Sequence, residues 1–322
     1  MDKIKWGVIG CANIAENGVI PGIIESEGSE LYAIASRSES KAKNFMSKFA
    51  FKKSYFDYNK ILEDDQVDAV YIPLPNGLHK EWVIKAAQSG KHVLCEKPMG
   101  LTAKDSIEMF EVCRENGVLL MEAFAFMHSP QTIRVKQLVE GGAIGRLKYI
   151  NSYQIVQKNN KSDPRYDKAL GGGSVYDLGC YNLLISRHCA GKEPLMIKAN
   201  GNIDGGTGVD TSCLIEMDFG NNLLATVYCS FECGFGSEYN LFGEKGSIKV
   251  SGLFNLYGET EIIIEEKNRR YIEKIYCPSN YKLEVEQFNR CIRHGEKPLM
   301  TMENTVGNAA VIDEVLKQIY KI

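Results

Sequence analysis

The sequence predicts an α/β protein: an N-terminal doubly wound Rossmann domain, then an α+β domain with a large, mostly antiparallel open sheet. Over the first 120 residues or so, continuous apolar strand runs alternate with helical stretches, which is typical of a parallel sheet covered on both faces. After about residue 145, short strands follow one another across short turns, which is typical of antiparallel pairing. We therefore predict two domains, 1–123 and 124–322, and leave open whether the C-terminal helix packs back on the first domain.

In the first half, local signals support the individual elements. Apolar residues recur at helical spacing over 39–49, and Thr102 with Asp105 resembles an N-terminal capping box. We expect Pro21 and Gly22 to interrupt the first helix. The predicted strands are 3–10, 30–36, 68–74, 92–96 and 118–123. The predicted helices are 13–26, 39–49, 78–90 and 102–117.

The second half is predicted to be α+β. Its Phe-Gly-Asn-Asn stretch at 219–222 separates two strand runs and is typical of a tight turn between antiparallel strands. The predicted strands are 147–156, 214–219, 223–231, 237–250, 261–266 and 269–277. The predicted helices are about 174–190, 281–294 and 303–321.

Composition narrows the classes of function. Apolar residues make up 44% and charged residues 25% of the chain, which are ordinary values for a soluble globular protein. A net charge of -3 gives no reason to expect nucleic acid or an anionic membrane as partner, and no apolar run of about 18 residues predicts a membrane span. The N-terminus runs directly into a strand without a signal-peptide pattern, so we expect a cytoplasmic protein.

The ten cysteines are scattered and lack the spacing of zinc ligands. His188 and Cys189 are adjacent on a predicted helix, where neighbouring side chains point in different directions. We therefore expect reduced thiols and no metal site.

The stretch GVIGCANIA, residues 7–15, joins the first strand to the first helix. It follows the dinucleotide-binding pattern G-x-G-x-x-G with alanine at two of the three glycine positions. Gly10 supplies the tight turn, and Ala12 is tolerated if its backbone keeps a negative φ. Asn13, Ile14 and the free amides of the first helical turn would then face a pyrophosphate. By itself, the stretch fits an ordinary packed turn equally well.

The end of the second strand indicates NADP(H) rather than NAD(H). An NAD site places an acid there to bind the ribose hydroxyls, whereas this chain has Ser36, Arg37, Ser38 and Lys41. A guanidinium flanked by hydroxyls and an ammonium suits a 2′-phosphate, because arginine binds phosphate in a bidentate manner and stacks on adenine. NADP(H) is therefore favoured and NAD(H) stays open; the alternative for these residues is a solvated helix start.

Three further segments carry a resemblance to a known family. They are VYIPLPNGLH at 70–79, EKP at 96–98 and GGGSVYDLGCY at 171–181. Together they resemble the glucose–fructose oxidoreductase/inositol dehydrogenase (Gfo/Idh/MocA) family, and with the glycine turn and the C-terminal sheet the resemblance covers essentially the whole chain. It implies a nicotinamide-dependent oxidoreductase, and we expect a homodimer or homotetramer formed through the C-terminal sheet.

The resemblance implies that Tyr181 is the general acid/base, that Lys97 assists it and that Asp177 orients the substrate. The chemistry of these residues agrees with it. Lys97 follows a strand of a doubly wound sheet, where ligands bind, and an ammonium stabilises a nearby phenolate. Asp177 and Tyr181 are four apart on a predicted helix and so share a face. Each residue also has a purely structural alternative: Lys97 as a solvated loop lysine, Tyr181 as a half-buried aromatic and Asp177 as a carboxylate stabilised by the helix dipole.

The resemblance also implies residues around this catalytic set. Those that border the cofactor are Pro73, Leu74, Asn76, His79, Glu96 and Lys97. Those on the substrate side are Phe126, Arg165 and Tyr166. His79 could equally make a structural hydrogen bond, and Arg165 a surface salt bridge.

We therefore predict an NADP(H)-dependent oxidoreductase acting on a secondary alcohol or carbonyl of a sugar or sugar derivative. Tyr181, rather than the histidine of inositol dehydrogenase-like members, resembles the branch with aldose dehydrogenases, dihydrodiol dehydrogenases and sugar-nucleotide ketoreductases. A free aldose, a keto-sugar nucleotide and a trans-dihydrodiol stay open as substrates. A non-catalytic NADP(H)-binding sensor is the alternative, and the joint presence of Lys97, Asp177 and Tyr181 argues against it.

Overall fold

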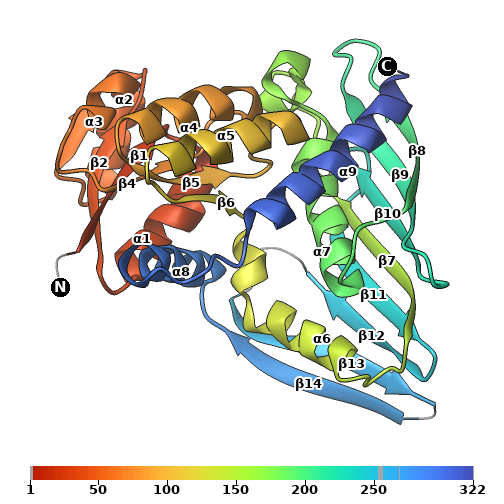
Figure 1. Ribbon diagram of the computed structural model, residues 1–322. Coiled ribbons are helices and arrows are strands. Elements are labelled where there is room, and N and C mark those ends of the chain that lie inside the picture. Colours follow the sequence, from red (N-terminus) through yellow and green to blue (C-terminus); the bar gives the residue numbers. More distant parts are fainter. Residues whose placement is uncertain (1–2, 253–256, 268, 322) are drawn as a thin grey trace. The chain divides into compact units, whose positions relative to one another are not determined.

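The computed structural model describes residues 3–252, 257–267 and 269–321, which form two compact units (Figure 1). The first unit contains the chain up to His128 and the segment Pro278–Val306. The second contains Ser129–Cys277 and the chain from Gly307 onward. The predicted fold class, a Rossmann sheet followed by a mostly antiparallel sheet, is confirmed. Compared with the predicted boundary at 123/124, the first unit extends a few residues further and also takes in Pro278–Val306.

The first unit is built on a six-stranded parallel sheet with the strand order β3-β2-β1-β4-β5-β6. The strands are β1 (Ile4–Ile9), β2 (Ser29–Ala35), β3 (Lys53–Tyr55), β4 (Ala69–Ile72), β5 (His92–Glu96) and β6 (Leu120–Ala123). All four residues of β4 are buried, as expected for a strand covered on both faces. The strand order reverses between β1 and β4, and doubly wound sheets bind ligands at the carboxyl ends of the strands beside such a reversal.

The helices of the first unit are α1 (Ile20–Glu25), α2 (Glu39–Lys48), α3 (Tyr58–Leu62), α4 (His79–Gln88), α5 (Ala103–Glu115) and α8 (Asn280–His294). Thr102 caps α5 as predicted, because its Oγ1 accepts a hydrogen bond from the Asp105 N–H at 3.0 Å. The expected break at Pro21 and Gly22 is wrong, because a π-helical turn over Ala15–Val19 continues directly into α1. Gly22 instead lets α8 approach, since a β carbon there would lie 2.8 Å from the carbonyl carbon of Tyr281.

The second unit is built on an eight-stranded sheet with the order β14-β13-β12-β11-β7-β10-β9-β8. The strands are β7 (Leu147–Ile155), β8 (Met196–Ile203), β9 (Asp210–Asp218), β10 (Leu224–Ser230), β11 (Gly236–Gly243), β12 (Gly246–Ser251), β13 (Gly258–Glu266) and β14 (Arg269–Cys277). β7 and β10 pair in parallel, and the other neighbours are antiparallel. The edge strand β8 was not predicted, because its sequence, MIKANGNI, has no clear apolar alternation and contains glycine and asparagine.

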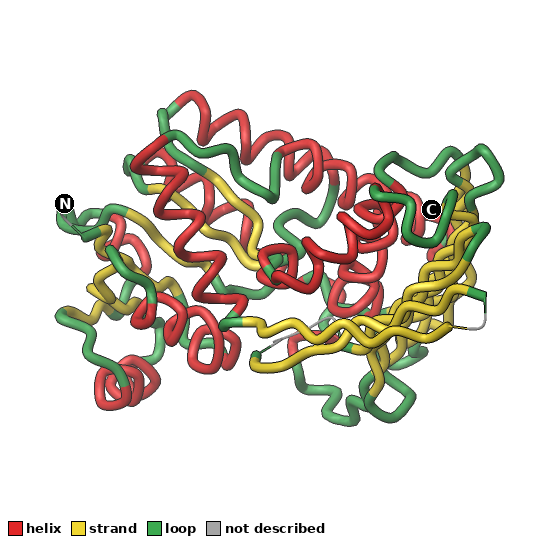
Figure 2. The backbone as a smooth tube through the Cα atoms, turned by 90° about the horizontal axis from the view of Figure 1, so that it is seen from below, coloured by secondary structure: helices red, strands yellow, loops and turns green. Residues whose placement is uncertain are grey.

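The sheet of the second unit is a single layer of strands (Figure 2) whose side chains alternate between two faces. In β9, Ile215 and Met217 are buried while Leu214 and Glu216 are exposed. The helix α7 (Cys180–Ala190) packs on β7 and β10, and α6 (Pro130–Glu140) packs on β13 and β14. The last helix, α9 (Met302–Tyr320), belongs to this unit from Gly307 onward. None of the helices in the described ranges is long and apolar enough to cross a membrane.

We predict that acidification destabilises the first unit through His128. The His128 ring is buried, its Nε2 contacts no hydrogen-bond partner among the described residues, and burial lowers its pKa to about 3. An unfolded histidine titrates near pH 6.5, so below that pH the unfolded chain binds more protons than the folded one. The contribution of His128 to the free energy of unfolding is therefore present above about pH 6.5 and is lost as the pH falls toward 3, by about 1.4 kcal/mol per pH unit.

His128→Gln removes this titration, so its free energy of unfolding should depend less on pH than that of the parent chain. Both tryptophans, Trp6 and Trp82, lie in the first unit, so tryptophan fluorescence follows urea unfolding of that unit. His294→Gln, at an exposed histidine of α8, is the matched control. The same acid dependence in His128→Gln as in the parent would contradict the prediction.

Candidate active site

The turn after β1 lies at the carboxyl edge of the parallel sheet. Gly10 has a φ of 119°, which side-chain-bearing residues rarely adopt, and a β carbon on it would lie 2.9 Å from Leu74 Cδ2. The φ of Ala12 is not positive, so its backbone accommodates the methyl group at this position of the turn. The Ala12 carbonyl accepts a hydrogen bond from the Glu16 N–H at 3.1 Å, so the turn leads directly into a helix. A glycine turn followed by free helical N–H groups fits a pyrophosphate.

Ser36, Arg37 and Lys41 follow β2 at the same edge of the sheet. The Ser36 side chain is buried and its Oγ accepts a hydrogen bond from the Ser38 N–H at 3.1 Å, whereas Arg37 and Lys41 are exposed. Glu39, the nearest acid in sequence, forms an ion pair of 2.7 Å along α2. The segment therefore presents two cations and several hydroxyls, a donor set that fits a phosphate group.

Glu96 is the last residue of β5, and Lys97 follows it. Glu96 is buried, and its carboxylate accepts a hydrogen bond from the Tyr71 hydroxyl at 2.5 Å and from the Lys97 N–H at 3.1 Å. Burial, and then the charge of Glu96, raise the pKa of Tyr71 well above its usual value, so Tyr71 remains a donor. The Lys97–Pro98 peptide is cis, and the Lys97 side chain is half-buried. The backbone that carries Lys97 is thus held by a buried carboxylate at the end of its own strand.

His79 connects the loops that follow β4 and β5. Its ring is fully buried, with Nε2 2.7 Å from the Leu74 carbonyl oxygen and Nδ1 3.1 Å from that of Pro98. Burial lowers the pKa of His79, so a neutral ring donates to one of these two oxygens. The ring therefore holds the Pro73–His79 loop, with Asn76, against the loop of Lys97, and a direct contact between His79 and a cofactor stays a prediction.

Sequence reasoning did not single out Glu284 and Tyr281 of α8. The Glu284 carboxyl is fully buried, and neither of its oxygens contacts a hydrogen-bond partner among the described residues. Burial and then Glu96 raise its pKa well above the usual range, so Glu284 keeps its proton. Burial likewise raises the pKa of Tyr281, whose ring packs against Gly18. The sequence did carry a signal for Glu284: it lies four residues before Phe288, so an acid falls on the apolar face of α8.

In the second unit, Asp177 and Tyr181 lie on the accessible side of one helix. A π-helical turn, Val175–Gly179, continues as α7, where the sequence predicted a regular helix from 174. Asp177 and Tyr181 are half-buried, whereas Leu178 and Cys180 are buried. Both polar side chains are therefore within reach of a ligand bound to this unit.

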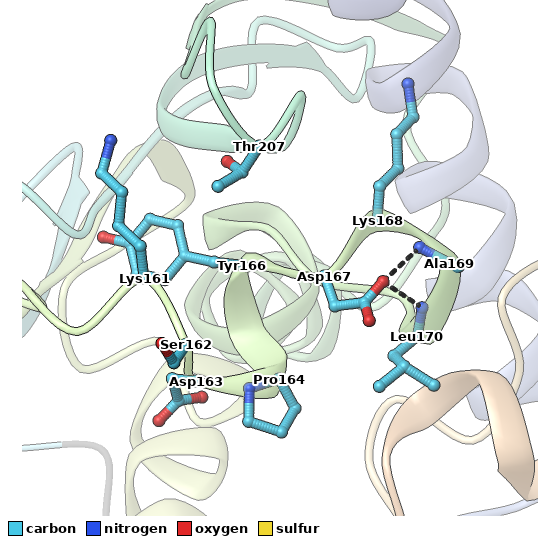
Figure 3. Close-up of a pocket in the computed structure, with 10 residues that line it drawn as sticks. All are labelled: Lys161, Ser162, Asp163, Pro164, Tyr166, Asp167, Lys168, Ala169, Leu170 and Thr207. Carbon is cyan, nitrogen blue, oxygen red and sulfur yellow. Dashed lines mark hydrogen bonds between the residues drawn. The ribbon is translucent and has the colours of Figure 1, made fainter.

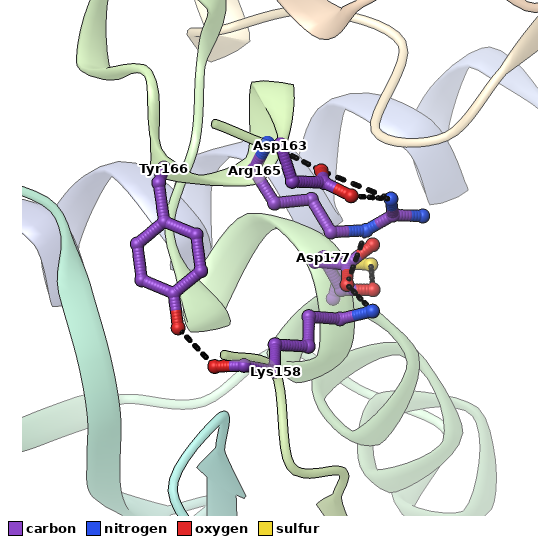
Figure 4. Close-up of polar contacts among 6 residues, drawn as sticks. Lys158, Asp163, Arg165, Tyr166 and Asp177 are labelled. Atoms are coloured by element: carbon purple, nitrogen blue, oxygen red, sulfur yellow. Dashed lines mark hydrogen bonds and ion pairs between the residues drawn. The ribbon is translucent and has the colours of Figure 1, made fainter. Parts of the chain in front are cut away.

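Asp177 is the centre of a group of charges (Figure 4). Arg165 Nε donates to Asp177 Oδ2 at 2.9 Å, and Lys158 Nζ lies 3.8 Å from the same oxygen. Arg165 also pairs with Asp163 at 3.2 Å, and Asp177 is the main cause of the raised pKa of Arg165. Lys158 was not predicted; a lysine just past the end of β7 was its only sequence signal. This group holds the Asp177 carboxylate in a fixed orientation and presents several donors to a hydroxylated ligand.

Two of the residues predicted on the substrate side are mainly buried. Tyr166 is 6% exposed, and its hydroxyl donates to the Lys158 carbonyl at 2.6 Å. Phe126 is 2% exposed and packs edge-to-face on Phe124 at 6.0 Å between ring centroids. Both side chains therefore stabilise their own units. Arg165, with 45% of its side chain exposed, is the most accessible of the three.

A hollow of about 490 Å³ lies beside this group and is formed by the loop 161–170 and Thr207 (Figure 3). The ammonium groups of Lys161 and Lys168 extend on the same side of it, on either side of Thr207. The Asp167 carboxylate accepts hydrogen bonds from the N–H groups of Ala169 and Leu170, which fixes the backbone of this part of the loop. Across the described ranges, no group of three or more His, Cys, Asp or Glu side chains is arranged to hold a metal ion.

Two family models match the chain. One, described as an oxidoreductase family with an NAD-binding Rossmann fold, matches residues 4–124, and the other, the GFO/IDH/MocA C-terminal domain, matches residues 132–249. The chain belongs to the Gfo/Idh/MocA oxidoreductase family. The resemblance inferred from the motifs is therefore confirmed, and so is the prediction of an oxidoreductase that uses a nicotinamide dinucleotide.

Relatives within this Gfo/Idh/MocA family match along nearly the whole chain. D-xylose 1-dehydrogenase (NADP(+)) 2 of Haloferax volcanii is 34% identical, covering 97% of this chain and 96% of its own. The dTDP-3,4-didehydro-2,6-dideoxy-alpha-D-glucose 3-reductase of Actinomadura kijaniata is 30% identical, covering 98% and 95%. A crystal structure of KijD10, a 3-ketoreductase from Actinomadura kijaniata, with NADP and TDP-benzene superposes with a TM-score of 0.94 at 28% identity, covering 99% of this chain and 98% of that one.

Proposed function

We propose that this oxidoreductase uses NADP(H) to interconvert a secondary alcohol and a carbonyl on a sugar or sugar derivative. The observation that carries the proposal is the accessible Asp177–Tyr181 face of the second unit, where Arg165 and Lys158 surround a carboxylate in a pattern suited to hydroxylated ligands. The named relatives act on sugars or sugar nucleotides, which supports it.

The preference for NADP(H) over NAD(H) rests on the segment after β2. Ser36 and Arg37 stand where an acid would bind the ribose hydroxyls of NAD, and Lys41 adds a second cation. NADP in the KijD10 structures and in the name of the Haloferax volcanii relative supports this preference. Gly10, Ala12, Asn13 and Ile14 would face the pyrophosphate in this arrangement.

In the proposed reaction, bound NADP(H) supplies or accepts the hydride. In the reductive direction Tyr181 gives its hydroxyl proton to the substrate oxygen, and in the oxidative direction its phenolate accepts that proton. Lys97 would assist this proton transfer, because an ammonium lowers the pKa of a nearby phenol. Asp177, held by Arg165, would accept hydrogen bonds from substrate hydroxyls and so orient the substrate.

Features of KijD10 support the assignment of Tyr181 and Lys97. Its solved structures include a variant with a tyrosine replaced by phenylalanine and variants with a lysine replaced by alanine or glutamate. The two substituted positions of KijD10 are separated by the same number of residues as Lys97 and Tyr181 in this chain.

Three substrate classes follow from the relatives: a free aldose, a keto-sugar nucleotide and a trans-dihydrodiol. Lys168 beside the hollow of the second unit favours a substrate that carries phosphate, such as a sugar nucleotide. Lys161, also beside the hollow, forms an ion pair with Asp204 at 2.5 Å. A screen of all three classes with NADPH or NADP⁺, followed by absorbance of the reduced nicotinamide, tests the proposal. Tight NADPH binding without turnover of any class would favour a cofactor-binding sensor instead.

We predict that Arg37→Ala weakens NADPH binding by about 10- to 100-fold and NADH binding by no more than about twofold, because only NADPH carries the phosphate that a guanidinium would bind. Titration calorimetry with each cofactor measures both constants. Lys43→Ala, at an exposed cation on α2, the helix that follows Arg37, is the control and should leave both unchanged. Equal losses for the two cofactors would remove the basis of the preference.

Tyr181→Phe is expected to lower kcat by at least about 100-fold while the dissociation constant of NADPH stays within about twofold, because the variant keeps the ring and removes only the transferable proton. Steady-state kinetics with the substrate found in the screen measure the first, and fluorescence titration measures the second. Tyr176→Phe, a half-buried tyrosine of the same helical segment, is the matched control. Near-parental turnover by Tyr181→Phe would refute the role of Tyr181.

We also propose that the outward face of the second sheet forms a homo-oligomer interface. Leu224 of β10 and Phe242 of β11 lie opposite Tyr149 of β7 in the sheet, and Leu214 of β9 lies on the same face. These apolar side chains are exposed: Leu224 by 52%, Phe242 by 41% and Leu214 by 46%. Leu214→Glu combined with Leu224→Glu should convert an oligomer to a monomer in light scattering, whereas Leu195→Glu, at an 80% exposed residue outside the strands, should not. A monomeric parent chain would contradict the proposal.

A further inference from the structure

Asp210 is a buried acid that the proposed proton transfer does not use. It is the first residue of β9 and is 0% exposed. Its Oδ2 accepts hydrogen bonds from the Ser174 hydroxyl at 2.7 Å and from the Val175 N–H at 2.8 Å. Its Oδ1 accepts from the Tyr320 hydroxyl at 3.2 Å, and its own N–H donates back to that hydroxyl at 2.8 Å.

These contacts place the Asp210 carboxylate at the start of the helix that carries Asp177 and Tyr181. The first N–H groups of a helix lack partners within the helix, and a carboxylate satisfies them well. Ser174, the residue before this helix, makes no side-chain capping bond of its own. Asp210 therefore caps the helix from the strand β9. Burial raises the pKa of its carboxyl, and the hydrogen bonds from Ser174 and Val175 reduce that rise.

The third glycine of the GGG motif makes room for this carboxylate. Gly173 has a φ of 126°, and a β carbon on it would lie 2.1 Å from Asp210 Oδ1. The Gly173 carbonyl accepts the hydrogen bond of the Asp177 N–H at 3.0 Å, so the glycine passes directly into the first helical turn. The position of Asp210 thus sets where the helix begins.

The C-terminal helix α9 holds the same helix at a second point. Asn308 Nδ2 donates to the Cys180 carbonyl at 3.0 Å, next to Tyr181, while Tyr320 near the other end of α9 contacts Asp210. Asp177 and Tyr181 therefore lie on a segment anchored at its start by Asp210 and one turn later by Asn308. A shift of either anchor moves both side chains together.

We propose that Asp210 is a positioning residue for proton transfer by Tyr181: its buried carboxylate fixes the start of the helix that carries Tyr181 and Asp177. This inference rests on the proposed function of Tyr181. A misplacement of about 1 Å in a reacting group can cost about 100-fold in rate, so the anchor has a kinetic effect beyond stability.

Asp210→Asn keeps the shape of the side chain and removes its charge. We expect kcat to fall about 10- to 100-fold, with the NADPH dissociation constant within about twofold of the parent, because the predicted NADPH-binding residues lie in the other unit. Asp218→Asn, at the other end of β9, is the matched control and should keep the parental kcat. A folded Asp210→Asn chain with the parental kcat would overturn the proposal.

If Asp210→Asn does not fold, Ser174→Ala and Tyr320→Phe each remove one hydrogen bond to the carboxylate and leave the charge in place. Ser174→Ala should lower kcat by about 3- to 10-fold, in proportion to a single lost hydrogen bond. Tyr320→Phe should lower kcat by at least as much, because it also removes the hydrogen bond from the Asp210 N–H. Parental kcat in both folded variants would equally overturn the proposal.

The double variant of Asp210→Asn and Tyr181→Phe separates this proposal from the proposed function. If Asp210 acts through Tyr181, adding Asp210→Asn to Tyr181→Phe should lower kcat by less than about threefold more. Full additive losses in kcat would show that Asp210 acts elsewhere. If Tyr181→Phe alone keeps the parental kcat, the proposed function of Tyr181 fails, and Asp210→Asn measured alone shows whether the anchor affects catalysis by another route.

Discussion

The second unit depends on one buried carboxylate, that of Asp210, which links its own strand to two other segments of the chain. Asp210 receives hydrogen bonds from Ser174, Val175 and Tyr320, so a single side chain joins β9, the start of the Tyr181 helix and the end of α9. Unpaired N–H groups at a helix start are costly when buried, and a local N-cap would normally satisfy them. Here the cap comes from a strand more than thirty residues further along the chain, so the position of the helix start depends on β9.

The first unit solves a related problem with His79 and Glu96. Both are buried near the carboxyl ends of parallel strands. His79 contacts the Leu74 and Pro98 carbonyls of two loops, and Glu96 accepts hydrogen bonds from the Lys97 N–H and the Tyr71 hydroxyl. The loops that carry Leu74 and Lys97 are therefore fixed by side chains beneath them, not by regular secondary structure. A rigid set of loops at this edge is what a bound dinucleotide requires, because each backbone donor must already face it.

The residues that carry the proposed chemistry lie within the segments that the two family models match. Gly10 and Lys97 lie within 4–124, and Tyr181 lies within 132–249. The pairing of Asp177 with both Arg165 and Lys158, and the two lysines beside the hollow formed by the loop 161–170, are contacts of this structure. Substrate choice in a shared fold depends on such loop residues, because the fold alone does not select a substrate. Tyr166 and Phe126, which were predicted on the substrate side, are mainly buried, and a contact of either with substrate stays a prediction.

The sequence by itself determined the two sheets and the residue types that carry the proposed chemistry, because apolar periodicity, capping residues and short motifs are local signals. The Thr102 cap, the Gly10 turn and the helix at 174–190 could all be predicted in this way. The π-helical turns over Ala15–Val19 and Val175–Gly179 could not. Only the tertiary structure revealed the contacts of Asp210 and Lys158 and the burial of Glu284, because each depends on a segment elsewhere in the chain. It also showed that Pro278–Val306 belongs with the first unit, where Gly22 allows α8 to approach α1. Such contacts depend on which distant elements pack together, and local sequence patterns carry no record of that packing.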